Sequence, residues 1–420
     1  MKDYQKKKLS ELSEKKDAVV SGPFGSNLKV SDYKTEGIPI LRLQNIGKGY
    51  FIEKNIKYIS EEKAEELKYH SFIVGDIALA KLGIPIGKTC IIPEHFKSGI
   101  ITADIVRIRP DTKNVDYKYL EFYLNTDLSV AQLTGNISGA TRPRVNLSSV
   151  RDIEIPIPPL PEQKRIVAIL DKAFATIAKA KANAEQNLNN AKELFESYLQ
   201  GVFENKGSDW VDKKLEELSD KKKSIVSGPF GSNLKVADYR ESGVPMIRLQ
   251  NIGKGVFIEK NIKYLDTEKA EELKSHSFRT GDIVLAKLGI PIGKTCIIPE
   301  HFGSGIIVAD IVRIRPNKNN ISYKFLEYFL NTKLSVSQLS KNISGATRPR
   351  VNLSDVRNII VPVPPLPEQR KIVLELDALQ EETKKLEVIY QQKIDNLEDL
   401  KKAALQKAFN GELPEKEIAL

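Results

Sequence analysis

Ile155-Pro-Ile-Pro-Pro-Leu-Pro-Glu-Gln-Lys-Arg-Ile-Val167 is the stretch that decides the fold, because a globular segment gives way there to a long helical pattern. Prolines lack an amide donor and have a fixed φ, so they end the strand that precedes them. Pro161 suits the first position of the helix, where a missing N–H costs nothing. The stretch returns as Val361-Pro-Val-Pro-Pro-Leu-Pro-Glu-Gln-Arg-Lys-Ile-Val373, so the chain makes this transition twice.

A long amphipathic helix is predicted after each proline stretch. Apolar residues recur at steps of four and three from Ile166 to Ala184, and again from Ile372 to Tyr390 with Thr383 within the stripe. This spacing keeps one stripe on a single side of a helix and is typical of coiled coils. A helix of roughly 40 residues is about 60 Å long, too long for an ordinary domain core. We therefore expect two helical spacers.

The whole chain is a tandem repeat. Ser21-Gly-Pro-Phe-Gly-Ser-Asn-Leu-Lys-Val30 returns 206 residues later, as Ser227 to Val236, and the same offset relates Arg42 to Arg248 without any insertion. This period is far above the roughly 20 to 50 residues of solenoid repeats, so each repeat is a globular domain plus a helix. The predicted parts are a domain at 1–157, a helix at 158–205, a domain at 206–364 and a helix at 365–420.

Each globular domain is predicted to belong to the α+β class, with mixed α and β elements. Short β-rich runs bounded by Gly, Pro or Asp predict strands at 39–43, 76–80, 88–92 and 105–109. Ser60 to Lys68 is typical of a short capped helix. Tyr117 to Leu133 has an aromatic-rich helical pattern. We expect its aromatic residues to pack on the sheet rather than to stack on bases.

We expect the two long helices to lie side by side and antiparallel. Helix one then leads from domain one to domain two, helix two leads back, and a pseudo-two-fold axis relates the domains. A DNA duplex has two-fold axes perpendicular to its length. Two matching readers related in this way fit an inverted repeat, with the helices setting the gap between its halves.

Composition sets the outer limits for the function. The 420 residues have a formal net charge of +10 and are 41% hydrophobic, so the chain can bury real cores and favours an acidic partner such as nucleic acid. Cys90 and Cys296 lie in apolar Thr-Cys-Ile-Ile runs, which predicts buried free thiols in a reducing compartment. Met1 to Lys8 lacks the apolar core of a signal peptide, and no apolar run approaches about 18 residues. We expect a cytoplasmic protein without membrane contact.

The patterns that would indicate catalysis are absent or wrongly spaced. Gly83-Ile-Pro-Ile-Gly-Lys-Thr89 has three residues between its glycines, where a phosphate-binding loop needs four, and is interpreted as a connection between strands. Lys88 and its repeat Lys294 are candidate phosphate contacts. The histidines lack metal-ligand spacing, and we find no nucleophile triad, base-methylation motif or cofactor fingerprint. The sequence predicts a chain that is not an enzyme and binds no metal or cofactor.

The first candidate DNA-binding cluster follows a predicted strand, beside a glycine turn. Its members are Arg42, Gln44, Asn45 and Lys48, repeated as Arg248, Gln250, Asn251 and Lys254. Arginine can bond bidentately to guanine, and asparagine or glutamine to adenine. A surface strand with internal hydrogen bonds explains the same residues, and the sequence leaves both interpretations open.

The second candidate cluster lies in Ser138-Gly-Ala-Thr-Arg-Pro-Arg-Val-Asn146 and its repeat. Its members are Arg142, Arg144 and Asn146, repeated as Arg348, Arg350 and Asn352. A loop of small residues with two arginines can enter a groove or clamp a phosphate. A structural turn that returns the chain to the proline stretch is the equally open alternative.

With these residues laid out, the chain resembles the specificity (S) subunit of type I restriction-modification systems. The resemblance covers essentially the whole chain, twice over. It is carried by Ser-Gly-Pro-Phe-Gly-Ser-Asn-Leu, Ile-Pro-Ile-Leu-Arg-Leu-Gln-Asn-Ile, the Gly-Asp-Ile strand at Gly75, Gly-Ala-Thr-Arg-Pro-Arg-Val-Asn-Leu and Pro-Leu-Pro-Glu-Gln-Lys-Arg-Ile. The four predicted parts look like the family's order of target-recognition domain, helical spacer, target-recognition domain and helical spacer.

The resemblance implies a non-catalytic subunit that reads a bipartite site in double-stranded DNA. It also implies two methyltransferase (M) subunits that carry S-adenosylmethionine, and restriction/translocase (R) subunits. Apolar helix residues that a two-stranded pair leaves partly exposed suit such docking: Phe195, Tyr198, Leu199, Leu386 and Ile389. Most members pair two dissimilar recognition domains, whereas these nearly match, so we predict inverted and matching half-sites.

Two other functions are consistent with parts of the sequence. A protein-protein scaffold with a helical dimerisation rod fits the long helices, and binding to duplex DNA with its salt dependence separates it from the DNA-reading interpretation. An active nuclease or methylase is disfavoured by the missing motifs.

Overall fold

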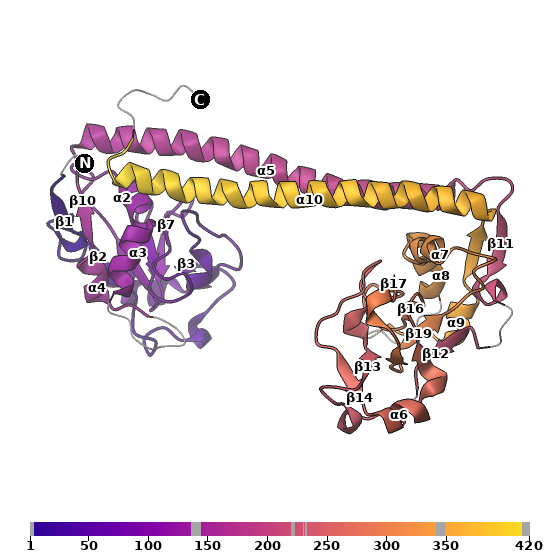
Figure 1. Cartoon of the computed structure of the whole chain (residues 1–420). Helices are drawn as coiled ribbons and strands as arrows, with labels where there is room; N and C mark the ends of the chain where they lie inside the picture. The colour runs from indigo at the N-terminus through magenta and orange to yellow at the C-terminus, as the bar shows by residue number, and fades with distance from the viewer. Residues whose placement is uncertain are drawn as a thin grey trace. The chain divides into compact units, whose positions relative to one another are not determined.

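The computed structural model describes residues 4–135, 144–219, 223–229, 231, 233–341 and 349–413. The chain divides into two compact units, of which unit 1 comprises residues 1–184 and 392–420 and unit 2 comprises residues 185–391. Each unit therefore contains one globular domain, the start of one long helix and the end of the other. Figure 1 shows the two long helices, α5 and α10, side by side.

Unit 1 is built on two four-stranded sheets and one two-stranded sheet. The first four-stranded sheet has the order β2 (Val19–Ser21), β9 (Ile105–Ile108), β6 (Ile77–Ala80) and β7 (Thr89–Ile91). The second has the order β4 (Lys57–Ile59), β3 (Ile38–Leu41), β8 (Ser98–Ile101) and β5 (Ser71–Ile73). The small sheet pairs β1 (Lys6–Lys8) with β10 (Glu154–Pro156). The β3–β8 pair is parallel, and the other pairs in unit 1 are antiparallel.

The short α-helices of unit 1, within residues 4–135 and 144–184, are α1 (Glu61–Glu66), α2 (Tyr117–Leu124), α3 (Asp127–Thr134) and α4 (Leu147–Arg151). The aromatic pattern predicted at 117–133 is split into α2 and α3. The split has a local cause, because the Thr126 hydroxyl donates to the Tyr123 carbonyl and accepts from the Ser129 amide, which caps a new helix. Tyr119 and Tyr123 are both buried. Tyr123 packs in the cluster that contains sheet residues such as Ile77 and Val106, as predicted, whereas Tyr119 packs against the long helices, at Leu170 and Leu405.

Unit 2 repeats this arrangement. Its sheets have the orders β12-β19-β16-β17, β14-β13-β18-β15 and β11-β20. Its strands are β11 (Val211–Lys214), β12 (Ile225–Ser227), β13 (Val244–Ile247), β14 (Lys263–Leu265), β15 (Ser277–Phe278), β16 (Ile283–Ala286), β17 (Thr295–Ile297), β18 (Gly305–Ile307), β19 (Ile311–Ile314) and β20 (Ile360–Val363). Its short α-helices are α6 (Thr267–Glu272), α7 (Tyr323–Leu330), α8 (Lys333–Ser340) and α9 (Leu353–Arg357).

Helices α5 (Leu160–Glu204) and α10 (Leu366–Phe409) are antiparallel, as predicted. In unit 1, Leu170 near the start of α5 shares a hydrophobic cluster with Leu405 near the end of α10. In unit 2, Phe203 near the end of α5 shares a cluster with Leu376 near the start of α10. Leu199, which we expected to be partly exposed, is buried in this cluster, whereas Tyr198, Leu386 and Ile389 are exposed.

A buried glutamine joins each globular domain to its helix. Gln163 accepts from the Asp116 amide (2.8 Å) and donates to the carbonyls of Asn114 (3.0 Å) and Pro158 (2.8 Å). Gln369 makes the equivalent bonds in unit 2, accepting from the Ser322 amide at 2.7 Å. Both side chains are fully buried, so each helix begins at a fixed place on its domain.

The cores have the character that the sequence predicted. Cys90 and Cys296 are free and buried, and burial raises the pKa of both thiols. In the part of the chain that the structure describes, no helix is long and apolar enough to cross a membrane.

The Ser-Gly-Pro-Phe-Gly turn depends on a glycine in tight contact with backbone. A Cβ on Gly22 would lie 2.0 Å from the carbonyl oxygen of Thr102, whereas a Cβ on Gly25 would meet nothing within 4 Å. We expect Gly22→Ala to lower the free energy of unfolding by about 1–3 kcal/mol, because backbone must move to admit the methyl group. Urea denaturation of the full chain checks this, with Gly25→Ala as the control in the same turn. Equal midpoints for the two variants would contradict the close contact.

Candidate nucleic-acid interface

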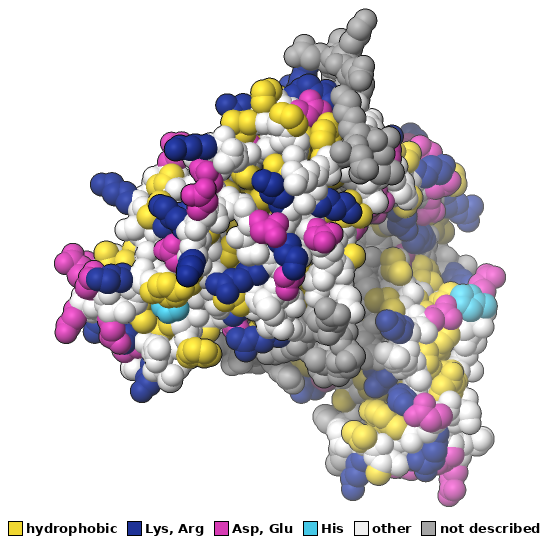
Figure 2. Space-filling model, turned by 90° about the vertical axis from the view of Figure 1, so that its left-hand side faces the viewer, with side chains coloured by type: hydrophobic (Ala, Val, Ile, Leu, Met, Phe, Trp, Pro, Cys, Tyr) yellow, Lys and Arg dark blue, Asp and Glu magenta, His cyan; other side chains and the backbone are white. Residues whose placement is uncertain are grey.

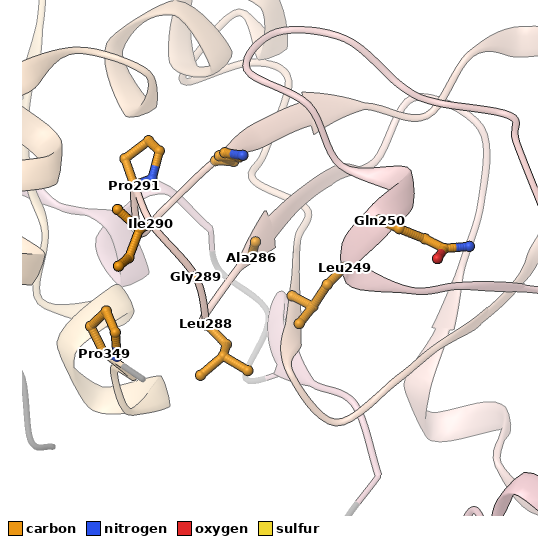
Figure 3. A pocket seen from close by; sticks show the side chains of 9 residues that line it. Leu249, Gln250, Ala286, Leu288, Gly289, Ile290, Pro291 and Pro349 are labelled. Carbon is orange, nitrogen blue, oxygen red and sulfur yellow. The ribbon is translucent and has the colours of Figure 1, made fainter. Parts of the chain in front are cut away.

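A first cleft lies between the short 3-10 helix after β3 or β13 and the Gly-Ile-Pro-Ile-Gly loop. In unit 2 it has a volume of about 500 Å³ and is lined by Leu249, Gln250, Ala286, Leu288, Gly289, Ile290, Pro291, Lys294 and Pro349. Figure 3 shows Gln250 on one side and Ile290 with Pro291 on the other. The cleft of unit 1 has about 480 Å³ and contains Gln44 and Lys88 at the equivalent places.

The two first clefts are chemically the same. Each lining residue in one unit has an identical residue 206 positions away in the other. Ile84 and Ile290 at the loop tips are both more than four-fifths exposed, although they are large and apolar. Exposed apolar side chains beside an exposed glutamine can contact the edges of bases.

Gln44 and Arg42 project from the 3-10 helix Leu43–Asn45 and its preceding residue. The Gln44 amide donates a long bond of 3.4 Å to the carbonyl of Asn55, and the Arg42 guanidinium donates to the same oxygen. Gln250 and Arg248 make the same bonds to Asn261 in unit 2. The glutamines are exposed and retain hydrogen-bonding capacity for a ligand.

Asn45 and Asn251 serve the fold instead. Both are fully buried, and Asn45 Nδ2 donates to the carbonyls of Ile52 (2.9 Å) and Lys54 (3.2 Å). Its Oδ1 accepts from the Arg42 amide at 3.1 Å. The interpretation by internal hydrogen bonds therefore applies to these asparagines, and we remove both from the candidate DNA-binding set.

Lys48 and Lys254 are not brought to the first cleft. Lys254 pairs with Glu196 on α5, and Lys48 Nζ lies 3.9 Å from Asp127 at the start of α3. Neither lysine lines the first cleft. Both are therefore placed apart from the glutamines with which they were grouped in the sequence.

A second cleft in unit 2 lies beside the Ser227-Gly-Pro229 turn and has a volume of about 880 Å³. Its polar lining includes Lys223, His276, Lys287, Arg350, Asn352 and Arg357. His276 Nδ1 lies 2.7 Å from the Ser227 carbonyl, and Arg357 donates to the Ile225 carbonyl at 3.1 Å. Unit 1 has the same contacts at the equivalent residues His70 and Arg151.

Lys81 and Lys287 are functional candidates that sequence reasoning missed. Each is only 7% exposed and donates to a serine hydroxyl, of Ser21 in unit 1 and of Ser227 at 2.6 Å in unit 2. Burial, and then the positive charge of the nearby Arg144 or Arg350, lowers the pKa of the two lysines. An anion entering the cleft would favour their charged form. The only signal in the sequence was the repeated Ala-Lys-Leu-Gly before the glycine-rich loop.

Arg350 lines the second cleft of unit 2, and Arg144 is its equivalent in unit 1. Arg144 pairs with Asp104 (2.7 Å) and Arg350 with Asp310 (2.8 Å), and both arginines remain exposed. Arg144 also forms a backbone bridge with Leu82, which lines the first cleft of unit 1. Arg142 and Arg348 lie outside the described residues.

Asn146 and Asn352 cap short helices. The Asn146 side chain accepts from the Ser149 amide at 2.7 Å at the start of α4. The Asn352 amide donates to Asp355 at 2.8 Å at the start of α9. Both residues are exposed, and Asn352 lines the second cleft, so capping does not withdraw it from a ligand.

The wider surface carries both signs of charge. Figure 2 shows lysine and arginine side chains spread over the face in view and interspersed with aspartate and glutamate. His95 pairs with Glu53 (2.9 Å) and His301 with Glu259 (2.6 Å). Among the described residues, no three His, Cys, Asp or Glu side chains group to hold a metal ion.

The family model that matches this chain matches it twice, once in each repeat. The family model of the type I restriction modification DNA specificity domain matches residues 1–189 and 200–396. The chain is 29% identical over 301 residues to the type I restriction enzyme MjaVIII specificity subunit of Methanocaldococcus jannaschii. This alignment covers 67% of this chain and 68% of that protein. It is 23% identical to the EcoBI specificity subunit of Escherichia coli, over 94% of this chain and 85% of that one.

Solved structures share the fold. One, described as showing complex assembly and conformational transition of the type I R-M system, aligns with a TM-score of 0.76 at 20% identity, over 98% of this chain and 99% of the other. The HsdS subunit of Thermoanaerobacter tengcongensis aligns with a TM-score of 0.56 at 21% identity, over 90% and 91%.

Asn45 and Gln44 are adjacent, but Asn45 is buried and structural whereas Gln44 is exposed. Substituting each residue separately distinguishes the two roles. We expect Asn45→Ala to lower the free energy of unfolding by about 1–3 kcal/mol, because it leaves buried backbone groups without partners. Gln44→Ala removes one long bond at an exposed site, so we expect a change within about 0.5 kcal/mol. Chemical denaturation of the two variants measures the difference. A Gln44→Ala variant as unstable as Asn45→Ala would show that the glutamine is structural.

Proposed function

We propose that this chain, which belongs to the type I restriction-modification DNA specificity family, reads a bipartite inverted-repeat site in double-stranded DNA. Each globular domain reads one half-site, and the antiparallel helices set the distance between the halves. The observation that carries the proposal is the identity of the two first clefts, lining residue by lining residue. Two identical readers on antiparallel helices are the protein counterpart of an inverted repeat.

The residues divide by the chemistry they can perform. Arg42, Gln44, Arg248 and Gln250 are proposed to contact base edges, because guanidinium and amide groups bond to purines bidentately. Lys88 and Lys294 are proposed to contact phosphates at the other side of the first cleft. The second cleft adds Lys81 with Arg144, and Lys287 with Arg350, as a further phosphate-binding group in each unit.

The long helices are the proposed docking surface for the partner subunits. Their outward residues include several large apolar side chains that the helix pair leaves exposed: Leu194, Tyr198, Leu374, Leu386, Val388, Ile389 and Leu400. Where such side chains form a contiguous patch, they mark a protein interaction site. We propose that two methyltransferase subunits, which carry S-adenosylmethionine, dock on the helices and are joined by restriction subunits. In this proposal the present chain supplies sequence recognition and no catalysis.

The methylation pattern of a host tests the inverted repeat. We expect methylome sequencing of a host that carries this chain with its methyltransferase partner to give a bipartite motif whose halves are the same sequence inverted. Deleting the gene for this chain should remove methylation at that motif and at no other. Two unrelated half-site sequences would contradict the proposal that the matching clefts read matching bases.

Substitutions in the first cleft separate base reading from backbone binding. We expect Gln44→Ala to relax preference at whichever half-site unit 1 occupies, with the loss of about 1–3 kcal/mol of discrimination at the contacted base pair. Lys88→Ala is the control across the same cleft, and should weaken binding about equally for all sequences and reduce the salt slope by about one. Titration of the partner-bound complex against duplexes substituted at single positions measures both. An unchanged preference in Gln44→Ala would exclude this glutamine from base reading.

A further inference from the structure

The second cleft of unit 2 contains residues that differ from their equivalents in unit 1, whereas the residues that line the first clefts are identical at equivalent positions. Most lining residues of the second cleft of unit 2 have identical equivalents in unit 1. The exceptions in this lining are Lys223, Ile225 and Ser275, which correspond to Asp17, Val19 and Tyr69. One of these differences reverses a charge.

Asp17 and Lys223 occupy the same place in their units. The backbone carbonyl of Asp17 accepts from the Arg107 guanidinium, and that of Lys223 accepts from the Arg313 guanidinium. Both residues are exposed, and Lys223 lines the second cleft. The substitution of lysine for aspartate therefore changes the charge at the mouth of the cleft by two units without moving the backbone contact.

A second basic residue lies near this difference. Arg279 stands where unit 1 has Ile73, and it is exposed. Burial lowers the pKa of Arg313, and the positive charges of Arg315 and Arg279 lower it further. Burial also lowers the pKa of Arg107, but there Asp17 and Tyr69 act in the opposite direction. Asp76 and Asp282 raise the pKa of their arginines in both units, so the difference lies in Asp17 and Tyr69 near Arg107 and in Arg279 near Arg313.

We propose that the two units read the same bases but hold the DNA backbone unequally, with Lys223 and Arg279 giving unit 2 phosphate contacts that Asp17 and Ile73 cannot make. This inference rests on the proposed DNA-reading function. It concerns the second cleft, where Lys287, Arg350 and Arg357 already supply positive charge. A carboxylate at the place of Lys223 repels a phosphate, and a lysine attracts it, so the difference acts on backbone affinity and leaves base preference unchanged.

A charge exchange between the units tests the inference. The full chain with its methyltransferase partner is titrated against a duplex that carries the inverted repeat, over a series of salt concentrations. We expect Lys223→Asp to bind about three- to tenfold more weakly and to lower the salt slope by about 0.9 for each lost phosphate contact. We expect Asp17→Lys to do the reverse. Base preference, measured with single-position substitutions, should stay unchanged in both.

The double exchange, Asp17→Lys with Lys223→Asp, is the decisive variant. A symmetric site can be bound in either orientation, so moving the lysine from unit 2 to unit 1 should restore the affinity and slope of the unsubstituted chain. Lys97→Asp serves as the control, because it makes the same charge change at an exposed loop residue that has glycine at its equivalent, Gly303. It should alter the affinity less than Lys223→Asp, since neither Lys97 nor Gly303 lines the first or second clefts described above.

The outcomes separate the inference from the function on which it rests. Specific binding that neither Lys223→Asp nor Asp17→Lys alters overturns the inference and leaves the proposed function standing. A double exchange that stays weak also overturns it, because the two positions would then not be equivalent. Equal binding of the inverted repeat and a scrambled duplex by the unsubstituted complex overturns the proposed function itself. Denaturation midpoints of all the variants show whether a change in binding reflects a change in folding.

Discussion

The structure depends on one buried side chain used twice, the glutamine of each Pro-Leu-Pro-Glu-Gln stretch. Gln163 and Gln369 are fully buried, and each satisfies its amide with backbone groups of the globular domain and of the proline segment. A buried amide without partners costs about 1–3 kcal/mol, so the helix cannot rotate or slide on the domain without losing these bonds. The joint therefore fixes where a rigid helix of more than 40 residues begins. A binding site on the globular domain is therefore held in a fixed position relative to the start of the helix.

The C-terminal end of each long helix packs against the globular domain of the other repeat. Phe203 at the end of α5 packs on Phe325 and Phe329 with ring centroids 5.2 Å apart, and Phe409 at the end of α10 packs on Tyr119 and Tyr123 at the same distance. Each domain is thus held both by the start of its own helix and by the end of the other helix. Because the repeat has no insertions, the same contacts recur at the same offset. Duplication of one sequence was sufficient to produce two equivalent joints, and equivalent joints present equivalent clefts.

The spacing of apolar residues and the positions of proline and glycine predicted the architecture. They did not predict which polar side chains face outward. The long helices and most strands follow from apolar spacing and from proline and glycine positions. Gln44 and Asn45 are neighbours with similar chemistry, yet only Asn45 turns inward, because the returning segment at Ile52 and Lys54 presents carbonyls to it. No local pattern encodes that return. Lys81 was overlooked for the same reason, since its burial arises from Ser21, which is distant in sequence. The break between α2 and α3 was readable in principle from Thr126 as a cap.

In the proposed function, the differences between the repeats follow from what each cleft would contact. A residue that reads a base is constrained by the partner atoms on that base, and the first clefts have kept identical linings. A residue that contacts a phosphate meets the same charge on every sequence, so its replacement changes affinity without changing the site that is read. Lys223 lines the second cleft of unit 2 where unit 1 has Asp17, and such a difference would leave the proposed base-reading residues unchanged. In the proposed function, the two repeats differ in backbone affinity while they recognise one half-site, because Asp17 and Lys223 are not among the residues proposed to read bases.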